Sequence, residues 1–427
     1  MLLQTKITYK DKFWAYLNKD NFDHMEGLID PLVYHSSFIT FARLFSVMDY
    51  EKLPVWMYIS PIATAISAIA AGTIVCISIT EYVRQFQIDL LTESGTYLFV
   101  MMYKLLLATS VIRGRKQYHK LLQALRDDFH YICTTGQKYR KKFFENQRRT
   151  FKTCVVVAIF TGSMGGGMAT CACIAIVIEF QRHDAVLIRP LPFPFWLFGY
   201  NLHASPTYEI LFAVSLMFTF FHTYVNICTH VIWIGEITCR ADIITWNLQD
   251  MLVDVIPSKN NEEKEYYVNL IKHRMRSVIE MHHDMFKLAD SYAAVFKKCL
   301  LYEQIVASPI ICLTAYCFAE KYDSGEFKLI LLLLCTAATV VAFIPCYLCT
   351  ILLEKVQSVS DACWDMPFWN VGPVIRPYLV LMMQRSMRPL PITAAGFADI
   401  SLQTFSSMMA RAYSCFNMLR QADFNIS

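Results

Sequence analysis

Apolar runs of similar length divide this chain into membrane-spanning segments. A helix needs about 20 consecutive apolar residues to cross a hydrocarbon core about 30 Å thick. A shorter apolar stretch at 32–48 is interrupted by His35 and Arg43, and it predicts an interfacial or re-entrant helix. Seven runs reach the full length, at 56–80, 94–112, 152–179, 207–235, 299–319, 328–353 and 392–419. The pattern therefore predicts an all-α membrane protein with seven transmembrane helices.

The connection between the fourth and fifth runs has a helical pattern of its own. Its apolar residues recur at roughly helical spacing, which predicts that both spans continue beyond the membrane as amphipathic helices. These residues are Tyr267, Leu270, Ile271, Val278, Met281, Met285, Leu288 and Val295. We therefore divide the chain into an N-terminal segment with the interfacial helix at 1–55, spans one to four at 56–235, a helical connection at 236–298 and spans five to seven at 299–427. The helical connection is a candidate anchor layer in which subunits would meet.

The last span, SLQTFSSMMARAYSCFNMLRQ at 401–421, has two different faces. Polar residues recur every three or four positions, which places them on one side of a helix with 3.6 residues per turn. The polar side holds Ser401, Thr404, Ser407, Arg411, Ser414 and Asn417, and the opposite side holds Leu402, Phe405, Met409 and Phe416. A span that contacted only lipid would need no polar side, so this one predicts a different environment on one face.

Composition supports a membrane protein and argues against several other classes. Apolar residues make up 55% of the 427 residues and charged residues only 17%. The net charge of +4 is small for this length, so we expect no nucleic-acid partner. Most of the fifteen cysteines lie in apolar runs, as Cys171 and Cys335 do, which indicates packing rather than a disulfide framework. The N-terminal residues lack a signal-peptide pattern, so we expect the first span to direct membrane insertion.

Lysine and arginine residues gather in alternate connections. They are concentrated before the first span and in the connections between spans two and three, four and five, and six and seven. Because cationic loops stay in the cytoplasm, this distribution predicts a cytoplasmic N-terminus and an extracellular C-terminus. That orientation is the inverse of a G-protein-coupled receptor, whose DRY and NPxxY motifs are also absent from the sequence. The sequon at Asn425 ends the chain close to the bilayer, so we expect it to be unused.

The sequence contains no catalytic or metal-binding constellation. It has no GxGxxG, Walker A, HExxH or GxSxG motif, so we expect neither an enzyme nor a cofactor. His282, His283 and Asp284 are adjacent, and neighbouring residues on a helix point about 100° apart, so they do not predict a metal site. Cys346 and Cys349 have the spacing of a zinc or redox pair, but no second pair accompanies them, and packing is the better interpretation.

Two features inside the spans have both a structural and a functional interpretation. Gly162 and Gly166 form a GxxxG pair, which favours close approach of another helix, although glycines facing a pocket would also leave room for a small ligand. Lys104 and Arg411 are cations inside spans, where an unpaired charge is costly. Each lies within about three turns of a predicted boundary, so its side chain can extend to the interface. We expect that neither cation contacts a ligand.

The C-terminal stretch resembles the signature of the insect odorant receptor family. That signature combines a proline, an Ile-Thr-Ala-Gly-like segment, a Thr-Phe pair, a cationic residue and a Tyr-Ser pair. The corresponding residues here are Pro391, Ile392 to Gly396, Thr404 and Phe405, Arg411, and Tyr413 and Ser414, and the preceding VLMMQRSMRPL, Cys346 and Trp369 also fit. The specific match runs from about residue 343 to the C-terminus. Upstream of it, topology, length and loop proportions agree with the family.

The resemblance implies a tetrameric, ligand-gated, non-selective cation channel. Members of this family are usually tuning subunits, which bind a small volatile odorant and assemble with a shared co-receptor in the dendrite membrane of olfactory sensory neurons. The connection between spans four and five is shorter than that of the co-receptor, which favours a tuning subunit here. The partners implied by the resemblance are therefore an odorant, co-receptor subunits and membrane lipid.

The resemblance also implies a pore and a ligand cavity. In this family span seven lines the central pore, which would account for the polar face of the last span. Alignment on Tyr413 places the hydrophobic gate position at Phe416, and Leu419 stands where the co-receptor has a polar residue. We therefore expect Tyr413, Phe416, Asn417 and Leu419 near the pore or its gate. The family's ligand cavity lies in the outer leaflet among spans two, three, four and six. At that depth this chain carries Tyr97, Met101, Gly166, Thr170, Phe212, Ser215, Leu334 and Ala338.

Two other functions fit parts of the pattern. A gustatory receptor of the same superfamily would also be a ligand-gated cation channel, but as a homotetramer. A polytopic transporter would be expected to show internal repeats with matching Gly- or Pro-broken helices, and the sequence shows no such symmetry. The odorant receptor subunit is therefore the preferred interpretation.

Overall fold

The described part of the chain is almost entirely helical. The computed structural model describes residues 56–86, 88–134, 137–181, 207–253, 261–325, 328–370, 374–388 and 392–424, together with residues 196 and 390. Within these ranges the only bridge between extended residues pairs Thr393 with Asp399. The interfacial helix predicted at 32–48 and the sequon at 425–427 lie outside the described residues.

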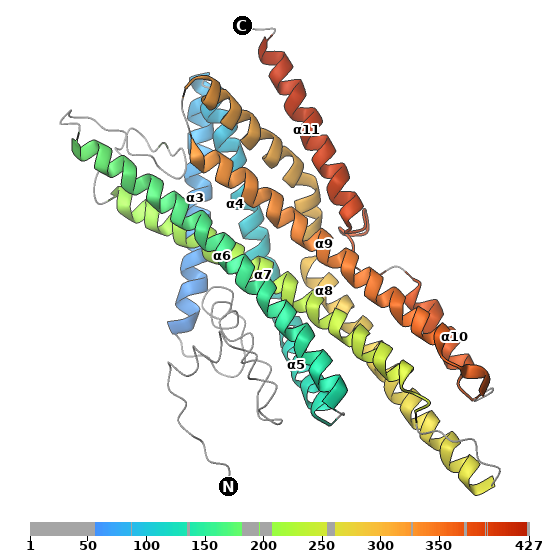
Figure 1. Ribbon diagram of the computed structural model, residues 1–427. Helices are drawn as coiled ribbons and strands as arrows, with labels where there is room; N and C mark the ends of the chain where they lie inside the picture. Colours follow the sequence, from blue (N-terminus) through green and yellow to red (C-terminus); the bar gives the residue numbers. More distant parts are fainter. Residues whose placement is uncertain are drawn as a thin grey trace.

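Seven long helices correspond to the seven predicted spans (Figure 1), although the last begins at Leu402 rather than at residue 392, because residues 392–401 form turns and the Thr393–Asp399 bridge. They are α3 (Trp56–Arg84), α4 (Ile88–Arg113), α6 (Gln137–Gln181), α7 (Thr207–Gln249), α8 (Asn261–Asp323), α9 (Leu329–Asp365) and α11 (Leu402–Phe424). Judged by length and hydropathy alone, α8 and α9 are the helices in the described part of the chain that could cross a membrane. The shorter elements are α5 (Arg115–Thr134), α10 (Arg376–Ser386) and a 3₁₀ turn, η3 (Phe368–Asn370).

Several helices extend well beyond the predicted spans. The 63 residues of α8 form one helix that is continuous through the predicted start of span five at 299. At 1.5 Å per residue its length is about 95 Å, roughly three times the thickness of a hydrocarbon core. In the same way α6 begins at residue 137 and α7 continues to residue 249. These extensions form a second helical layer with α5 and α10, two helices that the hydropathy pattern does not predict.

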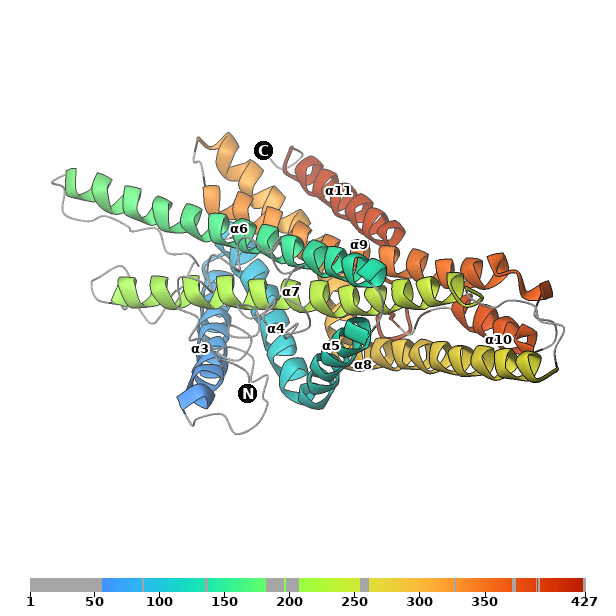
Figure 2. The ribbon, with the colours of Figure 1, turned by 60° about the horizontal axis from the view of Figure 1, so that its bottom comes forward.

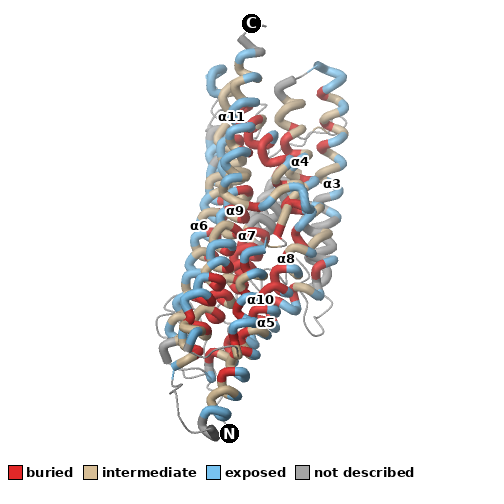
Figure 3. The backbone as a smooth tube through the Cα atoms, turned by 90° about the vertical axis from the view of Figure 1, so that its right-hand side faces the viewer, coloured by how far each residue is buried: buried red, intermediate tan, exposed pale blue. Residues whose placement is uncertain are grey.

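The largest core cluster lies where these extensions pack together. There α7 packs against α6, α8 and α9 (Figure 2). Trp233 is fully buried, with its ring edge-on to Tyr118, Tyr292 and Phe296 at centroid distances of 5.0, 5.7 and 5.9 Å. Such edge-to-face pairs stabilise a core beyond the area they bury. Buried residues gather in this layer, as Figure 3 shows.

The remaining lengths of the long helices expose large apolar side chains. Ile66, Val156, Ile159, Val177 and Ile305 are each more than half exposed. Apolar surface of this extent would be unfavourable in water but is the surface that hydrocarbon solvates. The last helix, α11, contacts α8 and α9 and lies to one side of the bundle (Figure 1).

Candidate ligand and pore sites

A small apolar cluster of α3, α4 and α9 brings together three residues predicted to line the ligand cavity. Tyr97 and Met101 are 2% and 5% exposed, and they pack with Val75 of α3 and with Leu334 of α9. Tyr97 and Met101 are four residues apart on α4, so they lie on one face of this helix. The cluster thus combines an aromatic ring, a flexible thioether and a branched aliphatic chain, a composition suited to an apolar guest.

Two further candidates lie on α6. The hydroxyl of Thr170 donates to the carbonyl of Gly166 at 2.7 Å, and both residues are exposed. Apart from the nearby backbone of α6, no described atom lies within 4 Å of a Cβ placed on Gly162 or Gly166, so the close helix approach expected from the GxxxG pair is not found in the described part of the chain. The tighter contact is at Gly167, where a Cβ would lie 3.4 Å from the side chain of Leu333 on α9.

The last three candidates are divided between α7 and α9. Ala338 packs with Ile311 of α8 and Met408 of α11, in a different cluster from Tyr97. Phe212 and Ser215 lie on α7, but their side chains are outside the part of the chain that the structure describes. The structure therefore places Ala338 of α9 at the contact with α8 and α11, away from Tyr97.

The first polar residues of the last span cap its helix. The Ser401 hydroxyl accepts a hydrogen bond from the Thr404 amide at 3.3 Å, and the Thr404 hydroxyl donates to the Asp399 carbonyl at 2.8 Å. The amide of Leu402 donates to the hydroxyl of Thr350 at 3.0 Å, which attaches the start of α11 to α9. The bonds from the Thr404 and Leu402 amides satisfy donors that would otherwise be unpaired at the helix start. Helix capping explains these two polar residues without a pore.

The middle of α11 keeps the two-sided character that the sequence predicts. Ser407, Arg411 and Ser414 are exposed, and both serine hydroxyls donate to carbonyls of their own helix. About 100° around the helix from these residues, Met408 and Ala412 are 0% and 3% exposed and pack against α8 and α9. The predicted apolar side is only partly buried, at Leu402, Phe405, Met409 and Phe416, so the packed side is turned from the predicted one. The polar side of α11 therefore points away from its own subunit.

The four predicted pore residues do not all point the same way. Tyr413 is 67% exposed on the outward side of α11. Phe416 and Leu419 are partly buried against a cluster that contains Tyr316 of α8, and Asn417 is also partly buried. Within one subunit, Phe416 thus lies at the edge between the exposed side and the packed side of α11.

A buried polar junction between spans was not anticipated from the sequence. Glu303 of α8 is 5% exposed and accepts a hydrogen bond from the Tyr103 hydroxyl of α4, and Tyr103 in turn accepts one from the Asn226 amide of α7 at 2.7 Å. One residue further, Gln304 donates to the Cys346 sulfur of α9 at 3.6 Å. Four helices meet here through polar groups, and an acidic residue in an apolar run was the signal that could have identified the junction.

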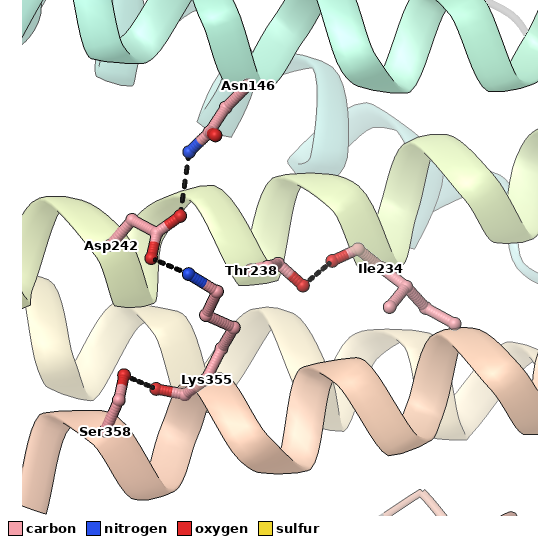
Figure 4. Close-up of polar contacts among 6 residues, drawn as sticks. All are labelled: Asn146, Ile234, Thr238, Asp242, Lys355 and Ser358. Atoms are coloured by element: carbon pink, nitrogen blue, oxygen red, sulfur yellow. Dashed lines mark hydrogen bonds and ion pairs between the residues drawn. The ribbon is translucent and has the colours of Figure 1, made fainter. Parts of the chain in front are cut away.

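A second polar network holds the long extensions of α6, α7 and α9 together (Figure 4). Lys355 donates to one carboxylate oxygen of Asp242 at 2.8 Å, and the Asn146 amide donates to the other oxygen at 2.8 Å. The nearby hydroxyls of Ser358 and Thr238 donate to carbonyls of their own helices. One carboxylate of α7 is therefore shared by donors from two neighbouring helices.

An ion pair attaches α5 to the same layer. Arg240 of α7 donates to Asp128 of α5 at 2.7 Å and to the Ala124 carbonyl at 3.2 Å. Glu236, one turn earlier on α7, accepts from Gln147 of α6 at 3.2 Å. Burial, together with the charge of Asp128, raises the pKa of Glu236 well above its ordinary value. The ion pair therefore joins α5 to α7, while the neutral form of Glu236 is favoured beside it.

The short helix α10 docks on α8 through a buried histidine. A ring nitrogen of His282 lies 3.0 Å from the Ser386 hydroxyl, and the Arg385 guanidinium stacks on Phe286 at 4.0 Å from its centroid. Burial, with the charges of Arg385 and His283, lowers the pKa of His282 to about 4. The neutral imidazole is therefore the form that holds α10 in place.

The helix α5 was missed because its segment is too polar to resemble a span. Its buried residues include Tyr118, Leu121, Leu125, Phe129 and Ile132, at intervals of three or four. That spacing predicts an amphipathic helix whose apolar face packs against other helices. A search for helical periodicity in the connection between spans two and three would have found it.

Comparison with known proteins decides the family. The chain matches the family model described as 7tm Odorant receptor over residues 87–413, which is most of its length. The chain belongs to the 7tm odorant receptor family. Similar curated proteins are odorant receptor 67c of Drosophila melanogaster, 24% identical over 73% of this chain and 74% of the relative, and odorant receptor 49a of the same species, 20% identical over 77% and 80%. The protein is therefore a multi-pass membrane receptor rather than an enzyme.

Solved structures show the same fold at lower identity. The insect olfactory receptor OR5 from Machilis hrabei superimposes with a TM-score of 0.67 at 14% identity, covering 96% of this chain and all of that one. The structure of OR5 in complex with eugenol gives a TM-score of 0.65 at 13% identity. The all-α, seven-helix membrane fold predicted from hydropathy is thereby confirmed for this member of the family.

Proposed function

We propose that this odorant receptor is a tuning subunit that binds a small volatile organic molecule and gates a non-selective cation channel. The observation that carries the proposal is the two-sided last helix. Its buried side packs on α8 and α9 through Met408 and Ala412, while Ser407, Arg411 and Ser414 face outward. An outward polar side on a membrane helix is favourable where that side meets water, as it would around a central pore.

The ligand cavity is proposed to lie between α4, α6, α7 and α9, in the outer half of the membrane. The cluster of Tyr97, Met101 and Leu334 would form its apolar wall. A relative of the same fold, OR5, is described in complex with eugenol, a small aromatic compound. Shape and dispersion would hold such a guest, at no more than about 1.5 kcal/mol per heavy atom.

Assembly is proposed to use the layer formed by the helix extensions. Several large apolar residues at its far end are exposed on the isolated subunit, namely Trp364, Trp369, Tyr378, Leu381 and Met387. Exposed aromatic and aliphatic residues of this kind are typical of the core of a subunit interface. The proposed assembly is a heterotetramer with the odorant receptor co-receptor, in the plasma membrane of olfactory sensory neuron dendrites. Cysteines introduced in this layer should cross-link two chains, and failure at every position would refute the interface.

The proposed orientation has a cytoplasmic N-terminus and an extracellular C-terminus. It rests on the lysine and arginine residues of the connections that join spans two to three and four to five. Epitope tags at both ends, stained in unpermeabilised cells, should reveal only the C-terminal tag. Staining of the N-terminal tag would refute this orientation and move the helical layer outside.

Functional expression tests the proposal as a whole. Cells that express this chain with the co-receptor should give an inward current to some volatiles in a broad panel, and cells with either chain alone should not give the same response. A ligand-evoked current from this chain alone would instead support a homotetrameric channel of the gustatory type. Surface-expressed pairs that respond to no volatile, including structural analogues of eugenol, would count against the tuning role.

A matched pair of variants tests the cavity once an active volatile is known. Leu334 packs with Tyr97 and Met101, whereas Leu332 on the same helix is exposed. We expect Leu334→Ala to raise the half-maximal concentration by about tenfold, because loss of a partly buried side chain costs about 1–2 kcal/mol of contact. Leu332→Ala should leave it unchanged. Equal effects of the two substitutions would remove this cluster from the site.

A further inference from the structure

The helices α4 and α8 run antiparallel and are held close near the end of α4. The Cys299 thiol donates to the Ser110 hydroxyl at 3.3 Å, and a Cβ placed on Gly114 would lie 2.7 Å from the Val295 side chain. The absence of a side chain at Gly114 therefore permits this approach. Further along, the Tyr302 hydroxyl donates to the Phe99 carbonyl at 2.9 Å.

This contact line fixes which residues share its flank. On two antiparallel helices, the residue just before a contact residue points to the same side of the contact on both helices, because each step turns about 100° around oppositely directed axes. Arg113 precedes Gly114, and Lys298 precedes Cys299. The two cations therefore flank the same side of the α4–α8 contact.

The same side carries apolar residues toward the middle of the membrane. Met102 and Leu106 lie eleven and seven residues before Arg113, and Ile305 lies seven residues after Lys298. These spacings keep each set on one face of its helix. We call Met102, Leu106, Arg113, Lys298 and Ile305 the α4–α8 groove.

The groove has the polarity of one phospholipid. Met102 and Ile305 are 46% and 62% exposed at its apolar end, and Arg113 and Lys298 are exposed at its cationic end. Neither cation forms an ion pair with another described residue. The distance along α4 from Met102 to Arg113 is about 16 Å, close to the thickness of half a hydrocarbon core.

We propose that the α4–α8 groove binds one anionic glycerophospholipid of the inner leaflet, with the headgroup between the two cations and an acyl chain along the apolar end. The assignment to the inner leaflet rests on the proposed orientation. An exposed acidic residue on α8, Asp290, lies two turns beyond Lys298, away from the membrane, and leaves the pair of cations available to a phosphate.

The test measures lipid retention by the full-length protein. The purified protein is equilibrated in detergent with equal amounts of phosphatidylserine and phosphatidylcholine of identical acyl chains, and bound lipid is quantified by mass spectrometry after gel filtration. We expect phosphatidylserine to be enriched about 30-fold, which is the effect of two cations near one anionic headgroup. Arg113→Gln with Lys298→Gln should reduce the enrichment to near unity.

Matched variants keep the test specific. The double variant Lys297→Gln with Lys152→Gln removes two other exposed cations and should preserve the enrichment. If this variant also lost the enrichment, the lipid would be held by general charge attraction, and the proposed site would be wrong. Arg113→Lys with Lys298→Arg keeps both charges and should retain lipid, which guards against a folding defect in the glutamine variant. Because no odorant or current is used, the result is independent of the proposed channel function.

Two other occupants of the groove would give distinct results. If soluble glycerophosphoserine abolished the enrichment at the same concentration as the lipid, the site would bind a free anion and the lipid proposal would be wrong. If Ile305→Cys formed a disulfide between two copies of the chain in the membrane, the groove would be a subunit contact. Lipid enrichment that survives the soluble headgroup, without such a disulfide, supports the proposal.

Discussion

Substitution of Lys355 by methionine should destabilise the layer in which the long helix extensions pack. Lys355 of α9 and Asn146 of α6 both donate to the carboxylate of Asp242 on α7 (Figure 4). Methionine keeps most of the side-chain volume but removes the charge. The Asp242 side chain, only 12% exposed, would then keep its negative charge with one neutral donor.

The size of this effect follows from the exposure of the two partners. Breaking a fully buried ion pair costs about 3–5 kcal/mol, and exposed pairs contribute about 0–1 kcal/mol. Because the Lys355 side chain is 38% exposed, solvent screens part of the interaction. We therefore expect a loss of about 1–3 kcal/mol. A second substitution, Asp242→Asn, should recover part of this loss because it removes the unpaired charge.

Thermal unfolding in detergent, followed by gel filtration of heated samples, measures this series. We expect the apparent midpoint to fall by several degrees in Lys355→Met and to recover partly in the double variant. Lys152→Met, which removes an exposed lysine of α6, serves as the control and should change little. Two outcomes would refute an interaction between Lys355 and Asp242. The effects of Lys355→Met and Asp242→Asn could simply add in the double variant, or Lys355→Met could have no larger effect than the control.

Three further predictions concern pH, packing and gating. The pKa of His282 in the folded protein is lowered to about 4, so its contribution to stability is present above pH 6.5 and should be lost as the pH falls from about 6.5 to 4. Thermal midpoints measured across this range should fall with pH, and His282→Gln should flatten that dependence. Gly235→Ala should lower stability by about 1–3 kcal/mol, because the new Cβ would lie 2.9 Å from a threonine hydroxyl of α6. Gly162→Ala is the control and should be neutral in the same assay, because its Cβ would have no described atom within 4 Å apart from the nearby backbone of α6. Phe416→Ser should raise the ligand-independent current of cells that also express the co-receptor, while Leu402→Ser should change it little; an unchanged leak at normal surface expression would place the gate elsewhere, most directly at Leu419 or in the co-receptor subunits.

Hydropathy was sufficient to predict the seven spans because the membrane imposes a length on each apolar run. The two-sided character of α11 was also predictable, since a helical period needs no knowledge of partners. Ser401 shows where this reasoning stops. Its position fits the polar side of the helix, but its hydroxyl accepts a hydrogen bond from the Thr404 amide and so caps the helix. Recognising it as a cap requires knowing that α11 begins at Leu402, which the sequence pattern does not give.

The polar networks could not be predicted because their partners are far apart in sequence. Asp128 and Arg240 are 112 residues apart, and Asp242 and Lys355 are 113 residues apart. In the sequence each is one charge among many in a polar connection. The Glu303 junction is different, because an acidic residue in a span is itself an unusual signal even when its partner Tyr103 is unknown.

If the receptor gates a channel as proposed, the distribution of packing predicts which helix moves. In the helical layer, α7 is held by an apolar core around Trp233 and by the charges of Arg240 and Asp242. The attachment of α11 is lighter. It consists of Met408 and Ala412 along α8 and α9, of the partly buried rings of Phe405 and Phe416, and of the hydrogen bond from Leu402 to Thr350. An ion pair between Arg420 and Asp323 adds to it, with the Asp323 side chain 55% exposed. A few kcal/mol of differential ligand affinity could shift such an attachment but not the layer. We therefore expect the layer to stay fixed during opening, while α11 moves against α8 at the edge where Phe416 lies.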